Sequence, residues 1–216
     1  MSILSKVKKL IGKKVYIEPI VDYNRYADSE KSYAGGSLAD SNVLIVTNTE
    51  LTADIKELFS INERATIAVL TLKGLVNQDA IISAGDNLIG PFTHIINIYK
   101  KETSELLTED SKYPETDEMY RVYQWLQEEV SYLVPLNQYA SVCTAYIGDG
   151  TQYSDVLCKN MDMCIRGLGE VMGNHTIINN GIVASSSVPM QEIINSAIYL
   201  SSKYGQIMTG EVLHLK

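Results

Sequence analysis

The C-terminal part of the 216-residue chain constrains the fold most, because it reads as strand, helix and strand in close succession. Residues 177–183 are rich in β-branched apolar side chains, as in a strand buried on both faces. Pro189 and Gly205 are typical of a helix start and stop, and residues 212–215 form a short final strand. The apolar stripe of the helix comprises Ile193, Ile194, Ala197, Ile198 and Leu200. This order predicts a βαβ unit of a parallel sheet.

Four segments upstream also read as buried strands, at residues 43–47, 64–72, 92–99 and 139–147. Helical apolar spacing follows three of them, from residue 49 to 59, from 115 to 135 and from 153 to 173. We therefore predict one α/β domain over residues 43–216, a Rossmann-like, doubly wound parallel sheet in three layers. Residues 75–90 are too few for both the third strand and the third helix, so the nucleotide-binding half is predicted to be truncated.

Residues 1–42 are predicted to form an extension before this domain. Residues 1–14 alternate lysines with apolar residues at helical spacing, which indicates a basic amphipathic helix. Such a helix packs on its own domain, on an acidic partner or on an anionic membrane surface. Residues 15–21 read as a strand that Pro19 restricts to a sheet edge, and residues 22–42 read as a linker.

Charge and composition limit the partners. The net charge of −8 argues against a general nucleic-acid binder, because phosphate binding needs a basic surface. The cysteines Cys143, Cys158 and Cys164 are odd in number and lack C-x-x-C spacing, so we expect neither a disulfide framework nor a metal site. No apolar run approaches the roughly 20 residues of a membrane span. With no secretory signal at the N-terminus, we expect a cytoplasmic protein.

The segment AIYLSSKYGQIMTGEVLHL, residues 197–215, resembles the end of the short-chain dehydrogenase/reductases (SDRs). In that family a helix ending L-(A/S)-S leads to a T-G-x-x-(L/I/V) strand at the subunit interface. The resemblance covers residues 43–216. It implies a Rossmann-like fold, an NADH or NADPH cofactor, and assembly through the last helix and strand.

The family's cofactor loop is not preserved. SDRs carry T-G-x-x-x-G-x-G after the first strand, where the glycines let the backbone approach the pyrophosphate. Thr47 matches the threonine, but Asn48, Thr49 and Glu50 follow, and no glycine occurs before Phe59. The carboxylate of Glu50 would repel a dinucleotide. These departures predict that the protein binds no cofactor.

The family's catalytic residues are also missing. The SDR motif Y-x-x-x-K places a lysine four residues after the catalytic tyrosine. Tyr153 is near the expected place, but Leu157 stands four residues on, and the nearest lysine is Lys159. Counting back from the C-terminal unit instead places Ser154 and Cys158 in the tyrosine and lysine positions. The family places its catalytic serine at the end of the central strand, but residues 145–147 contain no serine. The family's asparagine is absent from residues 115–135.

We therefore interpret the chain as a catalytically silent SDR-like protein. Its expected role is that of a structural or regulatory subunit, self-associated or paired with an active SDR such as a fatty-acid or polyketide ketoreductase. One alternative is a divergent NAD(P)H-dependent reductase that uses Tyr153 and Lys159. Another is an interaction module recruited through residues 1–14.

Assembly is expected through helices 115–135 and 152–172, packed as a four-helix seam, and through the C-terminal unit. The seam is predicted from the large side chains on the two helices, and the C-terminal contact from the family resemblance. The interface residues that we predict are Trp125, Leu126, Met161, Leu200, Val212 and Leu213.

Overall fold

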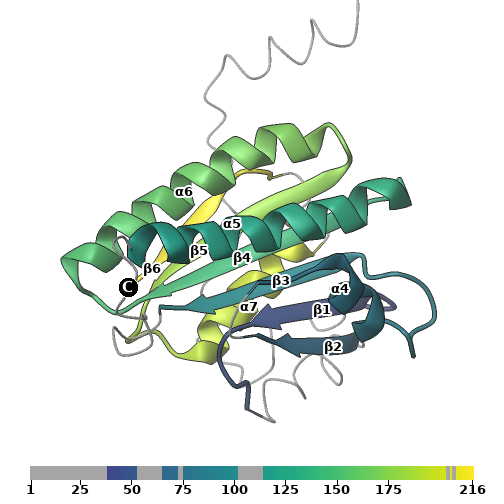
Figure 1. The fold of residues 1–216 in the computed structure, drawn as a ribbon, viewed down its shortest axis with the longest axis horizontal. Helices are drawn as coiled ribbons and strands as arrows, with labels where there is room; N and C mark the ends of the chain where they lie inside the picture. The colour runs from purple at the N-terminus through teal and green to yellow at the C-terminus, as the bar shows by residue number, and fades with distance from the viewer. Residues whose placement is uncertain (1–37, 53–64, 73–74, 102–113, 203–204, 206–207) are drawn as a thin grey trace, which may run out of the picture. The chain divides into compact units, whose positions relative to one another are not determined.

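The computed structural model describes residues 38–52, 65–72, 75–101, 114–202, 205 and 208–216. They form one six-stranded, fully parallel sheet in the order β2-β1-β3-β4-β5-β6 (Figure 1). The strands are β1 (Asn42–Thr47), β2 (Thr66–Thr71), β3 (His94–Lys100), β4 (Ala140–Gly148), β5 (Ile177–Ser185) and β6 (Val212–Leu215). The predicted sheet is therefore confirmed. Two expectations lie outside the described residues. They are the helix and strand at residues 1–21, and most of the helix at 49–59.

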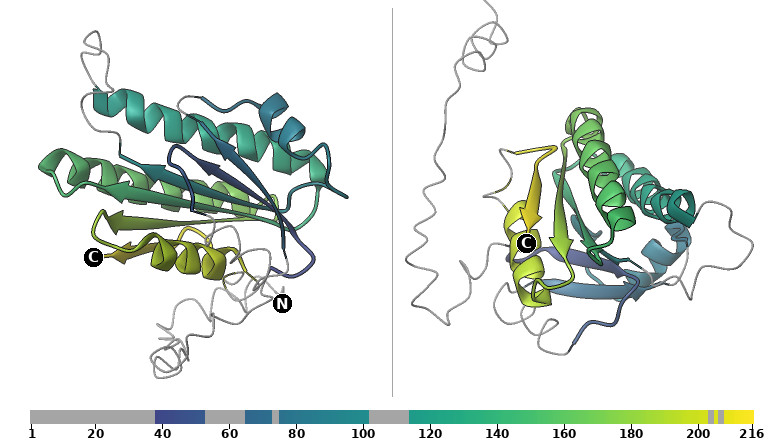
Figure 2. Two further views of the ribbon diagram at one scale, coloured as in Figure 1. Left: turned by 90° about the horizontal axis from the view of Figure 1, so that it is seen from below. Right: turned by 90° about the vertical axis from the view of Figure 1, so that its left-hand side faces the viewer.

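Helices cover both faces of the sheet, which confirms the three-layer architecture. The long helices α5 (Pro114–Leu133) and α6 (Gln152–Gly173) lie side by side on one face, and α7 (Met190–Ser201) lies on the other (Figures 1 and 2). The 3-10 turn Val134–Leu136 continues α5. Because β4 is buried along its whole length, both helical layers are needed to keep its apolar side chains from water.

The predicted truncation is found between β2 and β3. In the described part of this connection there is one short helix, α4 (Gln78–Ala84), and no strand. Asn77 caps α4 by accepting a 2.8 Å hydrogen bond from the backbone N–H of Ala80. A full doubly wound sheet has a further strand beyond β2, so its absence here leaves β2 as the edge of the described sheet.

The C-terminal βαβ unit is confirmed, although its helix ends earlier than predicted. α7 ends at Ser201, not at Gly205, because the N–H of Ser202 closes the last turn on Tyr199. Gly205 instead packs against the end of α7, where a Cβ would overlap the carbonyl oxygen of Leu200 and lie 2.8 Å from that of Tyr199. The glycine is thus required for a close approach of two backbone segments.

Asn180 in β5 holds this end of the molecule together. Its side-chain amide donates to the carbonyl oxygens of Leu200 at 3.4 Å and Met208 at 3.1 Å. Its side-chain oxygen accepts from the backbone N–H of Glu211 at 3.0 Å. One buried side chain therefore links β5, the end of α7 and the segment that leads into β6.

We predict that Gly205→Ala destabilises the protein by roughly 1–3 kcal/mol, because its Cβ meets rigid backbone atoms. Gly167→Ala in α6 is the matched control, since no atom lies within 4 Å of its added Cβ. There alanine should stabilise the helix by about 0.5–1 kcal/mol. Urea unfolding of both variants measures the difference, and equal midpoints for the two would contradict the packing described for Gly205.

Candidate functional site

The carboxyl ends of β1, β3 and β4 are the place where a ligand would be expected. In doubly wound sheets, ligands bind outside this edge at the point where the strand order reverses. Here the chain leaves β1 toward β2 on one side, and later strands are added on the other side, so the reversal lies between β1 and β3. The degenerate loop Thr47–Glu50 follows β1 at this point.

Asn48 bridges the strand ends at the reversal. Its side-chain amide donates to the carbonyl oxygen of Lys100 at 2.7 Å, and its side-chain oxygen accepts from the N–H of Lys100 at 2.8 Å. The Oγ1 of Thr47 also accepts from the N–H of Thr49 at 3.1 Å, which fixes the turn. The paired bonds of Asn48 continue the β1–β3 ladder beyond the last residue of β1, so this side chain lies across the switch point.

A second link joins the ends of β3 and β4. The ammonium of Lys101 donates to Asp149 at 2.6 Å and to Thr151 at 3.0 Å. Thr151 also donates from its backbone N–H and its hydroxyl to Asp149. Burial acts to raise the pKa of Asp149, but the hydrogen bonds from Lys101 and Thr151 and the charge of Lys101 prevail and lower it to about 2. The carboxylate is therefore held as a structural anion.

Ser154 and Cys158, which the count along the sequence places in the SDR tyrosine and lysine positions, pack at the end of β4. A Cβ at Gly148 would overlap the Ser154 hydroxyl and lie 3.3 Å from the Cys158 sulfur. The Ser154 hydroxyl accepts from the N–H of Asp149 at 3.1 Å. Burial is the main cause that raises the pKa of Cys158 above its usual value, which disfavours the nucleophilic thiolate. Both side chains therefore act in packing at this corner.

The alternative catalytic pair predicted from the sequence lies on α6. Tyr153 lies in the first turn of α6, and its side chain is outside the described part of the structure. Lys159 is exposed on the same helix. Six residues along an α-helix correspond to a rotation that leaves the two positions about 120° apart. The lysine is therefore not on the helix face that carries the tyrosine.

Inside the sheet lies a polar cluster that sequence reasoning did not identify. The amide nitrogen of Asn97 in β3 donates to Glu129 of α5 at 2.8 Å and to Thr144 of β4 at 3.2 Å. All three residues are fully buried. Burial raises the pKa of Glu129 to about 8, against the lowering effect of the Asn97 hydrogen bond. Asn97 Oδ1 and Glu129 Oε1 lack a hydrogen-bond partner among the described residues. In the sequence, the only indication of this cluster is a glutamate at an inward position of an amphipathic helix.

Two of the histidines have side-chain contacts within the fold. His94 is 2.6 Å from the Ser141 hydroxyl, and burial lowers its pKa to about 4, so it is neutral near pH 7. His214 in β6 contacts Asp162 of α6 at 2.9 Å. Among the described residues, no three His, Cys, Asp or Glu side chains are grouped as a metal would require. Nor does any described helix have the length and apolar character to cross a membrane.

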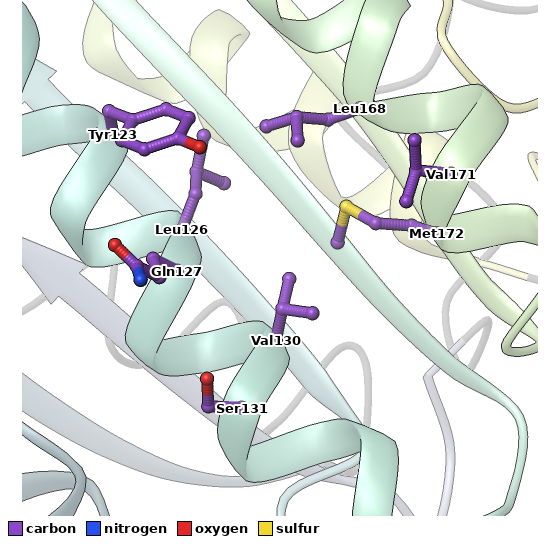
Figure 3. A pocket seen from close by; sticks show the side chains of 8 residues that line it. All are labelled: Tyr123, Leu126, Gln127, Val130, Ser131, Leu168, Val171 and Met172. Carbon is purple, nitrogen blue, oxygen red and sulfur yellow. The ribbon is translucent and has the colours of Figure 1, made fainter.

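A shallow groove between α5 and α6 is mostly apolar. Side chains from the two helices face each other across it (Figure 3). Its lining comprises Tyr123, Leu126, Gln127, Val130 and Ser131 from α5, and Leu168, Val171 and Met172 from α6. The large apolar side chains exposed along the two helices are Tyr120, Tyr123, Val156, Met163 and Val171. They form what we call the α5/α6 face.

The structure separates the predicted interface residues into two groups. Trp125, Leu126 and Met161 are buried inside the chain itself, at 1% exposure or less. Trp125 packs edge-on against Tyr99, with ring centroids 5.6 Å apart. Leu200 and Val212 are also buried, whereas Leu213 is 36% exposed. Assembly through these elements remains a prediction, and on α5 and α6 the exposed residues named above are the ones available for it.

These features define a doubly wound α/β protein of the Rossmann-like class, with the strand ends at its switch point tied to one another. The particular architecture is that of the SDRs, which comparison with solved structures confirms. A short chain dehydrogenase from Mycobacterium smegmatis has a TM-score of 0.65 at 11% identity, over 87% of this chain and 97% of that one. A short-chain type dehydrogenase/reductase from Mycobacterium marinum gives 0.61 at 12%, over 82% and 94%.

The enoyl-[acyl-carrier-protein] reductase (NADH) of Aquifex aeolicus VF5 is similar as well, with a TM-score of 0.63 at 14% identity, over 83% of this chain and 96% of that one. No family model and no curated protein sequence matches the chain. At identities this low, the structural similarity establishes the fold, and the activity of these enzymes does not transfer with it.

We predict that Glu129 makes the protein less stable as pH rises from about 5 to 8. The folded protein keeps the Glu129 proton up to a pKa of about 8, whereas the unfolded chain loses it near 4.5, the ordinary pKa of a glutamate. Between these values the unfolded state binds fewer protons, so the free energy of unfolding falls by roughly 1 kcal/mol per pH unit.

Glu129→Gln is the matched variant, because its neutral amide offers both an acceptor and a donor to Asn97 at every pH. Unfolding free energies measured for both proteins between pH 5 and 8.5 should diverge, with the variant more stable at the alkaline end. Parallel curves would show that Glu129 is ionised in the folded protein.

Proposed function

We propose that this protein is a catalytically silent SDR-like subunit, with a structural or regulatory role, that binds neither NADH nor NADPH. The observation that carries the proposal is the bridge from Asn48 to Lys100 across the switch point. A dinucleotide at this place needs free backbone N–H groups and a close approach to the chain. Here the Asn48 side chain already occupies the gap between the two strand ends.

The electrostatics of the loop support the same conclusion. Glu50 is exposed two residues after Asn48, where it adds a negative charge beside the position a pyrophosphate would take. Two lysines stand at the end of β3: Lys100 is exposed, whereas Lys101 is paired with Asp149 and has only 10% of its side chain exposed. An anionic ligand would therefore meet a repulsive carboxylate, and one of the two lysines is already engaged.

The corner at the end of β4 gives a second line of support. A reductase of this fold needs a proton donor and a base that reach the ligand from the start of the helix after β4. In this chain the buried Ser154 and the partly buried Cys158 pack against Gly148 instead. The competing candidate, a divergent NAD(P)H-dependent reductase, rests on Tyr153 in the first turn of α6, with Lys159 as its partner.

As a subunit, the protein would associate through its α5/α6 face. That face carries an apolar groove and exposed side chains such as Met163, which is 73% exposed. Exposed apolar surface of this kind is costly in water and marks an interaction site. We propose a second copy or an active SDR homologue as the partner, in the cytoplasm, with residues 1–14 as a further contact to a partner or membrane surface.

We predict no binding of NADH or NADPH by isothermal titration calorimetry with the full chain at ligand concentrations up to about 1 mM, a limit near −4 kcal/mol of binding free energy. As an independent check, neither nucleotide should raise the temperature at which the protein unfolds, because a ligand that binds the folded state would raise it. A dissociation constant in the micromolar range for either nucleotide would refute the silent-subunit proposal and favour the Tyr153 reductase.

We also predict that Met163→Asp weakens association through the α5/α6 face by at least about tenfold, because an unpaired charge would be buried there. Met163→Leu keeps the apolar surface and serves as the control. Since Met163 is exposed, neither variant should change the unfolding midpoint of the isolated chain. Sedimentation analysis of the wild type and both variants measures the effect, and identical masses across micromolar concentrations would exclude self-association by this face.

A further inference from the structure

No described strand pairs with the outer side of the edge strand β2. It pairs with β1 along its full length from Asn42–Thr66 to Thr47–Thr71, and it stands at the end of the described sheet (Figure 1). Its side chains are partly or fully exposed, whereas those of the inner strands β1, β3 and β4 are mostly buried. The strand that would cover this side in a full doubly wound half is missing from the described part of the chain.

The backbone hydrogen bonds show which groups of β2 point outward. The N–H of Thr66 donates to Ser41 at 3.0 Å, and that of Leu72 donates to Thr47 at 2.8 Å. Because backbone groups alternate along a strand, the even-numbered residues of β2 face β1. The N–H and C=O groups of Ile67, Val69 and Thr71 therefore face away from the sheet, and they have no hydrogen-bond partner among the described residues.

The strand β2 itself carries none of three common protections of an edge. Exposed edge strands are commonly shielded by a lysine, a proline or a bulge. β2 reads T-I-A-V-L-T, with no charge and no proline, and its register with β1 runs without a bulge. A straight, uncharged, partly apolar edge of this kind is suited to pairing with another strand.

We propose that β2 pairs with β2 of a second copy of this chain, antiparallel and across a two-fold axis at Val69. In this register Val69 faces its own counterpart, and Ile67 faces Thr71 of the second copy. The outward-pointing backbone groups of each residue then pair with outward-pointing backbone groups of the second copy, which gives about six backbone hydrogen bonds. The strand is thus complementary to itself, which is what an isologous contact requires.

The side chains fit the same register. On the face covered by α4 and α5, Ala68 and Leu70 pack against the core and would lie opposite each other across the axis. On the other face, Val69 would contact its counterpart, and Ile67 would lie opposite Thr71. Aliphatic cross-strand pairs and aliphatic–threonine pairs are favourable, and no charge approaches its own image. The two sheets would join into one continuous sheet.

This contact is independent of the proposed function and of the α5/α6 face. It is tested in the full chain carrying Met163→Asp, so that contacts through that face are weakened. Val69→Pro removes the outward N–H at the axis but leaves the ladder to β1 intact, since Val69 does not donate to β1. Val69→Thr keeps the N–H, the branched shape and the strand propensity, and is the matched control.

Sedimentation should show concentration-dependent dimers for the Met163→Asp protein and for the double variant Met163→Asp, Val69→Thr. The double variant Met163→Asp, Val69→Pro should associate at least tenfold more weakly. Equal association of the proline and threonine variants would overturn the proposal. So would a Met163→Asp protein that stays monomeric at concentrations up to about 100 μM, an outcome that points to a different occupant of the edge.

Thiol cross-linking reports the register without a proline. Across a hydrogen-bonded antiparallel pair, the Cα atoms of Val69 and its counterpart are about 5.5 Å apart, whereas those of Thr66 are on the order of 20 Å apart. In a chain with Cys158→Ser and Cys164→Ser, a short bifunctional maleimide should link Val69→Cys into dimers and leave Thr66→Cys unlinked. The opposite pattern, or none with Val69→Cys, would exclude this register.

Discussion

The burial of the central strands on both faces is the constraint on which the rest of this structure depends. Every residue of β4 is buried, and its neighbours β3 and β5 are nearly so. Such strands are stable only if helices cover both sides, because apolar side chains on either face would otherwise be exposed to water. α5 and α6 supply one cover and α7 the other, and the short connections between strand and helix follow from this need.

The same constraint explains what the truncation changes. A doubly wound half with three strands places its outermost strand at the sheet edge, away from the ligand site. Without that strand, β2 is the edge of the described sheet, and the backbone groups of Ile67, Val69 and Thr71 point away from β1. The missing strand therefore has its largest effect at β2, while the covered centre from β3 to β5 keeps the SDR architecture seen in the mycobacterial dehydrogenases.

The strands, helices and layer order could be predicted because each depends on a local pattern that repeats over several residues. Errors arose where the outcome depends on distance between segments. Gly205 was predicted to end a helix, yet its glycine is needed for contact with Leu200, a backbone approach that no periodicity reports. The interface predicted at Trp125 and Met161 stays a prediction, and both side chains are buried within the chain itself. The sequence could not indicate this, because an apolar side chain on an amphipathic helix faces either the core or a partner.

The candidate site was predictable only as a set of departures from the SDR motifs. That Asn48 would pair with Lys100 depends on the register between β1 and β3, which residue types alone do not define. The Asn97–Glu129–Thr144 cluster was missed for a related reason. Asn97 lies in a strand and Glu129 in a helix 32 positions later, and only their packing brings them together.

Several polar groups at the carboxyl ends of the strands are already paired with neighbouring protein groups. An active site keeps polar atoms unpaired at the ligand edge, so that substrate and cofactor complete their hydrogen bonds. Here Asn48, Lys101, Asp149 and Ser154 form hydrogen bonds to neighbouring protein groups at that edge. Inside the core, Asn97 Oδ1 and Glu129 Oε1 are among the buried atoms that have no hydrogen-bond partner in the described part of the chain, and burial raises the pKa of Glu129 to about 8. A polar edge that is already paired stabilises the chain itself.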